Sequence, residues 1–241
     1  MKKVFLLFCL TLLLSCLKVY ADDWYSTPPY ASSSRDSRWV VRAGMNVCVT
    51  SGKTFSEVKK SDGGHYKAKL GYDFSASFNK PLSSNGLFWG LEVAMGTRGL
   101  GFDNNASSNN ITVIVKSKLN AYNFRYVPWF LGYRKGLSEN FSFEVRFGPY
   151  FSYDFAGSEK TSVTILGDHS SHVTTTTKLN QLSGVDSNDG YQDYDLGLQA
   201  GLGFWYKQFN FDIAYDRGLI SYFRHESWYS NNIMIRLGYA F

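Results

Sequence analysis

The chain has 241 residues, of which 44% are hydrophobic, 17% aromatic and 19% charged, and its formal net charge is +5. This length fits one all-β domain or two small ones, and no repeat or change of composition divides the chain after Arg38. The positive charges form no basic stripe, so the composition excludes nucleic acid as an expected partner.

The first 21 residues have the pattern of a secretory signal peptide. A basic start, Met1-Lys2-Lys3, precedes an apolar run from Val4 to Leu14 and a small-residue cleavage site that ends at Ala21. The apolar run is too short for a comfortable membrane helix. We predict a signal peptide over 1–21, and its removal lowers the formal net charge from +5 to +2 because three lysines leave with it.

The same stretch allows a second interpretation, because Leu13-Leu14-Ser15-Cys16 resembles a lipoprotein cleavage box that would leave Cys16 lipidated. Cleavage after Ala21 is favoured, since a chain that inserts into the membrane by itself needs no lipid anchor. Cys48 is then alone in the mature chain and cannot form an internal disulfide. Residues 22–37 are rich in proline and serine and are predicted to be a flexible periplasmic N-terminal segment.

From residue 38 onward, apolar side chains alternate with polar or small ones. The clearest case is 141–155, where every second residue is apolar and the residues between include Glu144, Arg146 and Asp154. Successive side chains of a strand point to opposite faces, so this period of two predicts a strand with one apolar face. The same pattern predicts strands, in chain order, over 38–49, 65–78, 87–96, 195–206, 209–216 and 232–241.

An eighth strand is predicted within 115–133, where the alternation changes phase. Tyr122 follows one phase and Trp129 the other. We therefore expect a β-bulge near 125–128, where one extra residue lets the phase slip by one. Pro128 lies within this segment and lacks an N–H for the hydrogen-bond ladder.

The predicted linkers alternate in length along the chain. Transmembrane barrels pair short periplasmic turns with longer external loops, and an even number of strands leaves both termini in the periplasm. The long linkers are 51–64, 101–114, 156–193 and 217–230, and the short ones are 79–86, 134–140 and 207–208. Within the longest linker, Val173-Thr174-Thr175-Thr176-Thr177 favours a hairpin that extends two strands above the membrane.

These patterns predict an all-β fold, an eight-stranded antiparallel up-and-down transmembrane β-barrel over residues 38–241, in the bacterial outer membrane. After the signal peptide, no segment offers the roughly 18 consecutive apolar residues of a spanning helix. The alternative is a soluble lipocalin-like barrel with its apolar face inside. The membrane barrel is favoured because the apolar set is bulky and aromatic, whereas the other set suits the narrow interior of eight strands.

This orientation assigns the side chains to two sets. Aromatic residues prefer the membrane interface, and a periplasmic aromatic girdle is predicted from Trp39, Phe78, Trp89, Trp129, Tyr133, Phe141, Tyr206, Phe209, Tyr239 and Phe241, with a thinner outer girdle from Tyr66, Phe155 and Tyr194. Charged residues on the inner face are expected to pair across the lumen and plug it. This lumen polar network comprises Arg42, Lys67, Lys69, Asp73, Glu92, Arg98, Glu144, Arg146, Asp154, Asp195, Asp212, Asp216 and Arg236.

Several segments resemble the PorT-like outer-membrane β-barrel domain family. The last strand, Tyr229-Ser230-Asn231-Asn232-Ile233-Met234-Ile235-Arg236-Leu237-Gly238-Tyr239-Ala240-Phe241, is similar to the last strand of that family, and Arg125-Tyr126-Val127-Pro128-Trp129-Phe130-Leu131-Gly132-Tyr133 is similar to its proline-containing strand. Gly201-Leu202-Gly203-Phe204-Trp205-Tyr206 and residues 209–219 resemble it as well. The resemblance implies a barrel in which the terminal Phe241 serves as the insertion signal. It implies no single activity, because members of the family serve different roles.

Two groups of residues suggest chemistry. His225-Glu226-Ser227 has a histidine-x-serine spacing similar to that of lipid A deacylases, but Trp228 and Tyr229 replace the asparagine and alanine that should follow the serine. Consecutive residues of an extended chain also point to different sides, which argues against a triad. His169 and His172 beside Asp168 offer too few fixed ligands for a stable metal site. We therefore predict no enzymatic activity and no cofactor.

The predicted function is that of a non-enzymatic outer-membrane barrel with a structural or partner-binding role, through its external loops or its periplasmic tail. Aromatic and cationic residues in the last outer loop, Ser221-Tyr222-Phe223-Arg224 and Trp228-Tyr229, are of the types that anchor recognition, or else form an upper aromatic girdle. The expected partners are outer-membrane lipid and lipopolysaccharide, with another envelope protein or a surface glycan as further candidates. The alternatives are a lipid A-modifying hydrolase and a narrow channel.

Overall fold

The computed structural model describes residues 37–53, 56, 65–83, 85–108, 111–138, 140–166, 170–178, 191–223 and 227–241. All of them belong to one structural unit, residues 34–241. The predicted signal peptide, the lipidation alternative at Cys16 and nearly all of the predicted N-terminal segment lie outside the described residues. Within the described ranges, no helix is both long and apolar enough to cross a membrane.

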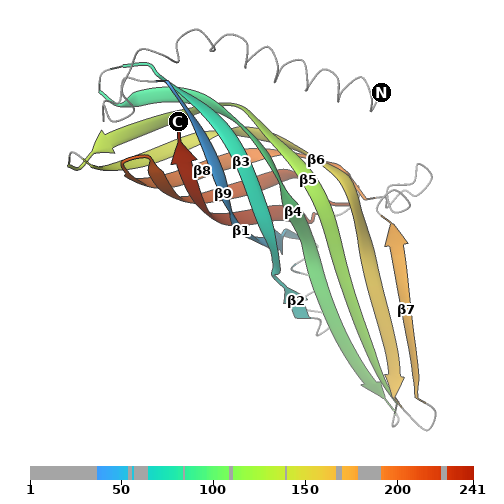
Figure 1. Ribbon diagram of the computed structural model, residues 1–241. Coiled ribbons are helices and arrows are strands. Elements are labelled where there is room, and N and C mark those ends of the chain that lie inside the picture. The colour runs from blue at the N-terminus through green and yellow to red at the C-terminus, as the bar shows by residue number, and fades with distance from the viewer. Residues whose placement is uncertain are drawn as a thin grey trace. The chain divides into compact units, whose positions relative to one another are not determined.

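The described residues form ten strands (Figure 1). Their bounds are β1 (Arg38–Ser51), β2 (His65–Lys67), β3 (Lys69–Pro81), β4 (Leu87–Ser108), β5 (Ile111–Gly136), β6 (Phe141–Leu166), β7 (Ser171–Lys178), β8 (Tyr194–Tyr206), β9 (Phe209–Ser221) and β10 (Tyr229–Ala240).

Eight of these strands close a ring of hydrogen bonds. The neighbours around the ring are β1, β3, β4, β5, β6, β8, β9 and β10, and β10 pairs with β1 to complete it. Every pairing is antiparallel and joins consecutive ring strands, so the fold is an up-and-down barrel of eight strands. The predicted fold class is confirmed, and β2 and β7 lie outside the ring, paired with β4 and β6 respectively.

Burial alternates along the strands as the period of two predicts. In β8, every second residue from Asp195 to Trp205 is buried, whereas the residues between are exposed. The exposed set is apolar and includes Leu196, Leu202 and Phe204. Phe147 on β6 is likewise exposed, while its neighbour Arg146 is buried. The apolar face therefore lies outside the barrel and the charged face inside, which excludes the lipocalin-like alternative.

The predicted bulge is present on β5. Glu92 pairs with Val127 and Gly90 with Phe130, so β5 holds one more residue than β4 in this interval. The pairing with β6 shows the same extra residue between Tyr126 and Leu131. A second bulge, which the sequence pattern did not indicate, lies on β6 at Phe155, between the partners of Tyr122 and Asn123.

Three of the predicted long linkers are partly wrong because strands continue into them, and in 217–230 residues 217–221 belong to β9 and 229–230 to β10. Residues 101–108 continue β4 and 111–114 begin β5, while 156–166 continue β6, so these strands extend well beyond the ring pairings of β8 and β9 (Figure 1). Threonine, valine and isoleucine in 111–114 and 161–165 favour strands even without a membrane, and residues 101–108, which contain none of these three types, are held in β4 by their pairing with β5. The predicted threonine hairpin is confirmed, because β7 pairs with the outer part of β6 from Ser158 to Ile165.

The predicted short linkers are short turns in the structure. The linker between β8 and β9 consists of residues 207–208, and Lys207 adopts a left-handed backbone conformation with φ of 55°. This is the conformation that a two-residue hairpin turn requires at its first position. Between β3 and β4, Gly86 has φ of 96°, and a Cβ there would lie 2.0 Å from the carbonyl oxygen of Arg134.

Candidate functional site

Charged side chains from opposite walls meet inside the barrel. Arg236 on β10 lies 2.9 Å from Asp73 on β3, 3.1 Å from Glu92 on β4 and 2.6 Å from Asp212 on β9. All four side chains are fully buried. Buried charges are stable only when they are paired and hydrogen-bonded, and here one guanidinium serves three carboxylates.

A second arginine crosses the lumen. Arg125 on β5 lies 3.0 Å from Asp73 and 3.2 Å from Asp216 on β9. Strands β5 and β9 are not neighbours in the ring, so this ion pair must pass through the interior. Arg42 on β1 reaches past β10 on the inside of the barrel and donates to Asn210 on β9 at 2.9 Å. The middle of the lumen is therefore filled by a connected network.

The network continues to the end with the short turns. Arg146 lies 2.6 Å from Asp212 and also contacts Glu144, which in turn pairs with Arg134. The indole N–H of Trp205 donates to Glu144 at 3.0 Å, and the Arg134 guanidinium lies 4.7 Å from the centre of the Trp205 ring. Cation–π contact and ion pairing thus close this end with large side chains.

At the other end, one arginine serves two carboxylates. Arg98 on β4 lies 2.8 Å from Asp154 and 3.2 Å from Asp195. The Tyr150 hydroxyl donates to Asp195 at 2.8 Å, and the Tyr191 hydroxyl donates to Asp154. These hydroxyls supply hydrogen bonds that a second cation would otherwise provide. In the rest of the described lumen, five buried arginines face five buried carboxylates, so the surplus negative charge lies at this end.

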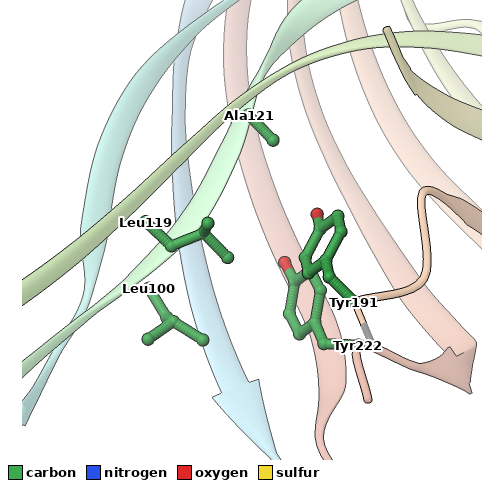
Figure 2. Packing of buried hydrophobic residues seen from close by; sticks show 5 residues of the cluster. All are labelled: Leu100, Leu119, Ala121, Tyr191 and Tyr222. Atoms are coloured by element: carbon green, nitrogen blue, oxygen red, sulfur yellow. The ribbon is translucent and has the colours of Figure 1, made fainter. Parts of the chain in front are cut away.

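Above Arg98 lies an aromatic lid, a buried cluster of Leu100, Leu119, Ala121, Tyr191 and Tyr222 (Figure 2). The two tyrosine rings stack with centroids 5.9 Å apart, and the Arg98 guanidinium lies 5.0 Å from the centre of the Tyr222 ring. Burial raises the pKa of the Tyr191 hydroxyl well above its ordinary value, so this group stays protonated and remains a donor. The lid closes the lumen at the end where β4, β5 and β6 extend.

Most of the predicted lumen residues meet in this network. Eleven of them are buried inside the barrel, Arg42, Asp73, Glu92, Arg98, Glu144, Arg146, Asp154, Asp195, Asp212, Asp216 and Arg236. Lys69, the first residue of β3, is only half-buried. Lys67 contradicts its prediction, because it lies outside the ring on β2, has a side chain 63% exposed and pairs with Asp103 at 2.6 Å. The alternation continued in phase to Lys67, but the strand breaks at Ala68.

Two buried arginines were missing from the predicted network. Arg125 sits beside the bulge, where the change of phase hid its face, and Arg134 fell in a predicted linker that is in fact the end of β5. Glu144 lies directly across from Arg134 on β6. Arg134 could therefore have been found as the residue of opposite charge that faces Glu144 across the hairpin.

The predicted periplasmic girdle residues lie mostly beside the short turns. The Trp39 and Phe78 rings are 5.2 Å apart, those of Phe141 and Tyr206 are 4.9 Å apart, and those of Phe209 and Tyr239 are 5.5 Å apart. Tyr133 pairs with Leu87 next to a turn, whereas Trp129 lies further along β5 at the bulge. Trp89 is next to Phe78, and Phe241 is next to Tyr239. The contact of this band with lipid remains a prediction.

Most of the residues that suggested chemistry fall outside the described part of the chain. His225, Glu226, Arg224, Asp168 and His169 fall outside the described residues, so the hydrolase alternative remains untested. His172 is described, and its ring contacts the hydroxyls of Thr164 and Thr174 on the projecting strands. Within the part of the chain that the structure covers, no group of three or more His, Cys, Asp or Glu residues could hold a metal ion.

Beyond the lid, β2, β7 and the extended parts of β4, β5 and β6 form an outer sheet. Its inner face continues the lumen side of the barrel and carries an apolar stripe. The register aligns Val115 with Val163 and Val163 with Val173, and one row further out it aligns Val113 with Ile165. Val173 is 60% exposed and Ile165 37% exposed. The opposite face continues the exposed side of the barrel wall and carries lysines.

Comparison with known proteins gives one family match. A model for the outer membrane protein beta-barrel domain matches residues 26–224. Among solved structures, Ail, the attachment invasion locus protein of Yersinia pestis, is similar at 13% identity and a TM-score of 0.38, over 86% of this chain and 99% of that one. The outer membrane protein OprG of Pseudomonas aeruginosa is similar at 16% identity and a TM-score of 0.36, over 86% and 97%. No curated protein matches the chain in sequence.

Proposed function

Because the chain belongs to the family of outer membrane protein beta-barrel domains, we propose that it is a non-enzymatic binding barrel that recognises a partner protein with its outer sheet. The family and the closed ring of strands make it a transmembrane β-barrel of the bacterial outer membrane. The proposal adds an orientation, with the short turns and both termini in the periplasm and the outer sheet outside the cell. A signal peptide over 1–21 would deliver the chain there, and kinship to PorT-like members remains a prediction.

The observation that carries this proposal is the apolar stripe on the inner face of the outer sheet. Val163, Val173 and Ile165 keep apolar surface beyond the lid, where the hydrogen-bonded wall of the barrel has ended. Apolar patches of this kind mark interaction sites on soluble parts of proteins. Strand β7 adds an edge, since β6 is its one partner among the described strands, and an exposed edge can accept a further strand.

The filled lumen supports binding over transport. Large side chains such as Trp205, Arg236, Phe130 and Met234 are fully buried, and the ion pairs that cross the interior leave little room in eight strands. A narrow channel would need this network to part and leave its charges unpaired. Single-channel recording in planar bilayers tests the point, and we expect no conductance steps.

Photocrosslinking in intact cells tests the binding role. A photoreactive amino acid at Val173 is expected to give a discrete crosslinked protein band. The matched control is Leu137, which is 67% exposed in the turn after β5 and is placed in the periplasm by the proposed orientation. The proposal fails if Val173 gives no protein adduct, or if Leu137 gives the same adduct.

A further inference from the structure

We infer that the face of the outer sheet opposite the apolar stripe binds the phosphate groups of lipopolysaccharide in the surrounding outer leaflet. This lysine face is made of Lys67, Lys116, Lys118, Lys160 and Lys178, all exposed. The inference goes beyond the partner-binding role and uses different residues. It rests on the proposed orientation, in which the outer sheet stands on the lipopolysaccharide side of the membrane.

The register gathers these lysines in adjacent rows. Lys118 on β5 pairs with Lys160 on β6 and, on its other side, with Gly101 on β4, which pairs with Lys67. Lys116 lies two residues from Lys118 on the same face of β5. Residues directly opposite one another in a sheet have Cβ atoms about 5 Å apart, and like charges there are destabilising. A bound anion would remove this repulsion.

The opposite charge is scarce on this face. Among its described residues, Asp103 is the one carboxylate, and it pairs with Lys67 at 2.6 Å. Glu159 is nearby in sequence but lies on the other face, where it accepts hydrogen bonds from Ser117 and Thr161. Among the described residues, Lys116, Lys118 and Lys160 form no ion pair with a carboxylate, which leaves a positive surface around them.

The bulge at Phe155 is what brings Lys160 to this face. Up to Tyr153, the odd-numbered residues of β6 point outward, as Phe147 and Phe151 do. Phe155 is exposed, and beyond it the pairing of Ala121 with Gly157 shows that odd-numbered residues have moved to the inner face. Without the extra residue, Lys160 would point toward the apolar stripe. The bulge therefore builds the cationic row.

The lysine face lies where lipid phosphates are expected. Tyr122 on β5 and Phe155 on β6 are the last exposed aromatic residues on these strands before the lysines, and their rings are 6.5 Å apart. Lys118 follows four residues outward from Tyr122 on the same face, about 13 Å along the strand. With a strand tilt of about 40°, this is about 10 Å above the aromatic row. Long lysine side chains can also reach back toward the interface.

A phosphorylated lipid is favoured over a soluble anion because the lysine face is continuous with the apolar outer wall of the barrel. The lysine face has no boundary with the exposed apolar wall, since alternation on β5 runs without a shift from Phe124 through Tyr122 to Lys118 and Lys116. A lipid that packs its acyl chains on the wall therefore presents its headgroup to these lysines. Apolar contact and ion pairing would act on the same molecule.

The test compares two variants of the full-length protein with equal loss of charge. One is the triple substitution Lys116→Gln, Lys118→Gln and Lys160→Gln, and the control is Lys80→Gln, Lys135→Gln and Lys207→Gln at the short-turn end, where all three lysines are exposed. Heat-modifiable gel mobility establishes that each variant is folded. Binding in detergent is measured with diphosphoryl lipid A, with dephosphorylated lipid A and with dextran sulfate as a soluble polyanion.

We expect the protein to bind diphosphoryl lipid A at least about tenfold more tightly than the dephosphorylated form. The lysine-face variant should lose about a hundredfold in affinity at low salt, from about fivefold per lysine over three lysines, while the control changes less than about threefold. The inference is overturned if both variants bind diphosphoryl lipid A equally well, if phosphate makes no difference, or if dextran sulfate binds the same face as tightly as lipid A.

A separate measurement addresses the orientation. Thr176→Cys on β7 should react with a membrane-impermeant maleimide in intact cells, whereas Leu137→Cys should not. Labelling at Leu137→Cys instead would overturn the orientation, and with it the partner-binding role and lipopolysaccharide as the ligand in the membrane, while phosphate binding in detergent would remain as measured. A wrong orientation and a failure of the lysines to bind phosphate therefore give different results.

Discussion

Replacing Arg98 with methionine should destabilise the barrel more than the same change at Arg236, although Arg236 makes more ion pairs. The two substitutions differ in whether the carboxylates that lose an arginine still have another cation as a partner. Without Arg236, Asp73 still pairs with Arg125 at 3.0 Å and Asp212 with Arg146 at 2.6 Å. Without Arg98, Asp154 and Asp195 keep hydroxyl and amide donors but no cation.

The magnitudes follow from the cost of an uncompensated buried charge. Removing one partner of a buried ion pair costs about 3–5 kcal/mol. We expect Arg98→Met to fall at the upper end, about 4–5 kcal/mol, and Arg236→Met at about 2–3 kcal/mol, because its carboxylates share other guanidinium groups. Lys135→Met is the control, because Lys135 is exposed at the end of β5.

Equilibrium unfolding in urea, with the protein in lipid vesicles and tryptophan fluorescence as the signal, measures these differences. A rescue variant sharpens the test, since Arg98→Met combined with Asp154→Asn and Asp195→Asn removes the charges altogether. It should regain most of the lost free energy of unfolding. The reasoning is refuted if Arg98→Met costs no more than Arg236→Met, or if the rescue variant is less stable than Arg98→Met alone.

Three further predictions concern the backbone and the C-terminus. Gly44→Ala should destabilise the barrel by more than about 2 kcal/mol in urea unfolding, because the new Cβ would lie 2.0 Å from the carbonyl oxygen of Ile235. Gly136 has open space around it, so Gly136→Ala should be nearly neutral in the same measurement. Lys207→Gly should raise the free energy of unfolding by up to about 1 kcal/mol by relieving the left-handed conformation, and a decrease would contradict this. Deleting Phe241 should lower the amount of heat-modifiable barrel in membranes, and an unchanged amount would refute its role as insertion signal.

The sequence predicted the barrel because one physical rule governs every strand. A wall between lipid and a charged lumen must alternate with a period of two, and segments such as 141–155 show that period without interruption. The rule weakens where the wall ends. Beyond the membrane both faces of a strand contact water or protein, so residues 101–114 and 156–166 carry no clear alternation and were predicted as linkers.

The lumen network was predictable in membership but not in pairing. Alternation placed Arg236 and Asp212 on the inner face, yet it contains nothing about which walls face each other across the ring. Arg125 was missed because a bulge changes the phase beside it, and Lys67 was wrongly included because a break at Ala68 ends the phase that alternation extends. The lysine face could not be predicted, since it depends on the bulge at Phe155 and on a register between four strands.

The most direct test asks whether the exposed apolar face of the barrel contacts lipid. Nitroxide labels at Phe147→Cys and Leu202→Cys, with Cys48 replaced by serine, should be accessible to oxygen dissolved in the bilayer and shielded from a water-soluble nickel complex. Strong relaxation by the nickel complex at both positions would contradict a wall that faces lipid, and the membrane barrel with it.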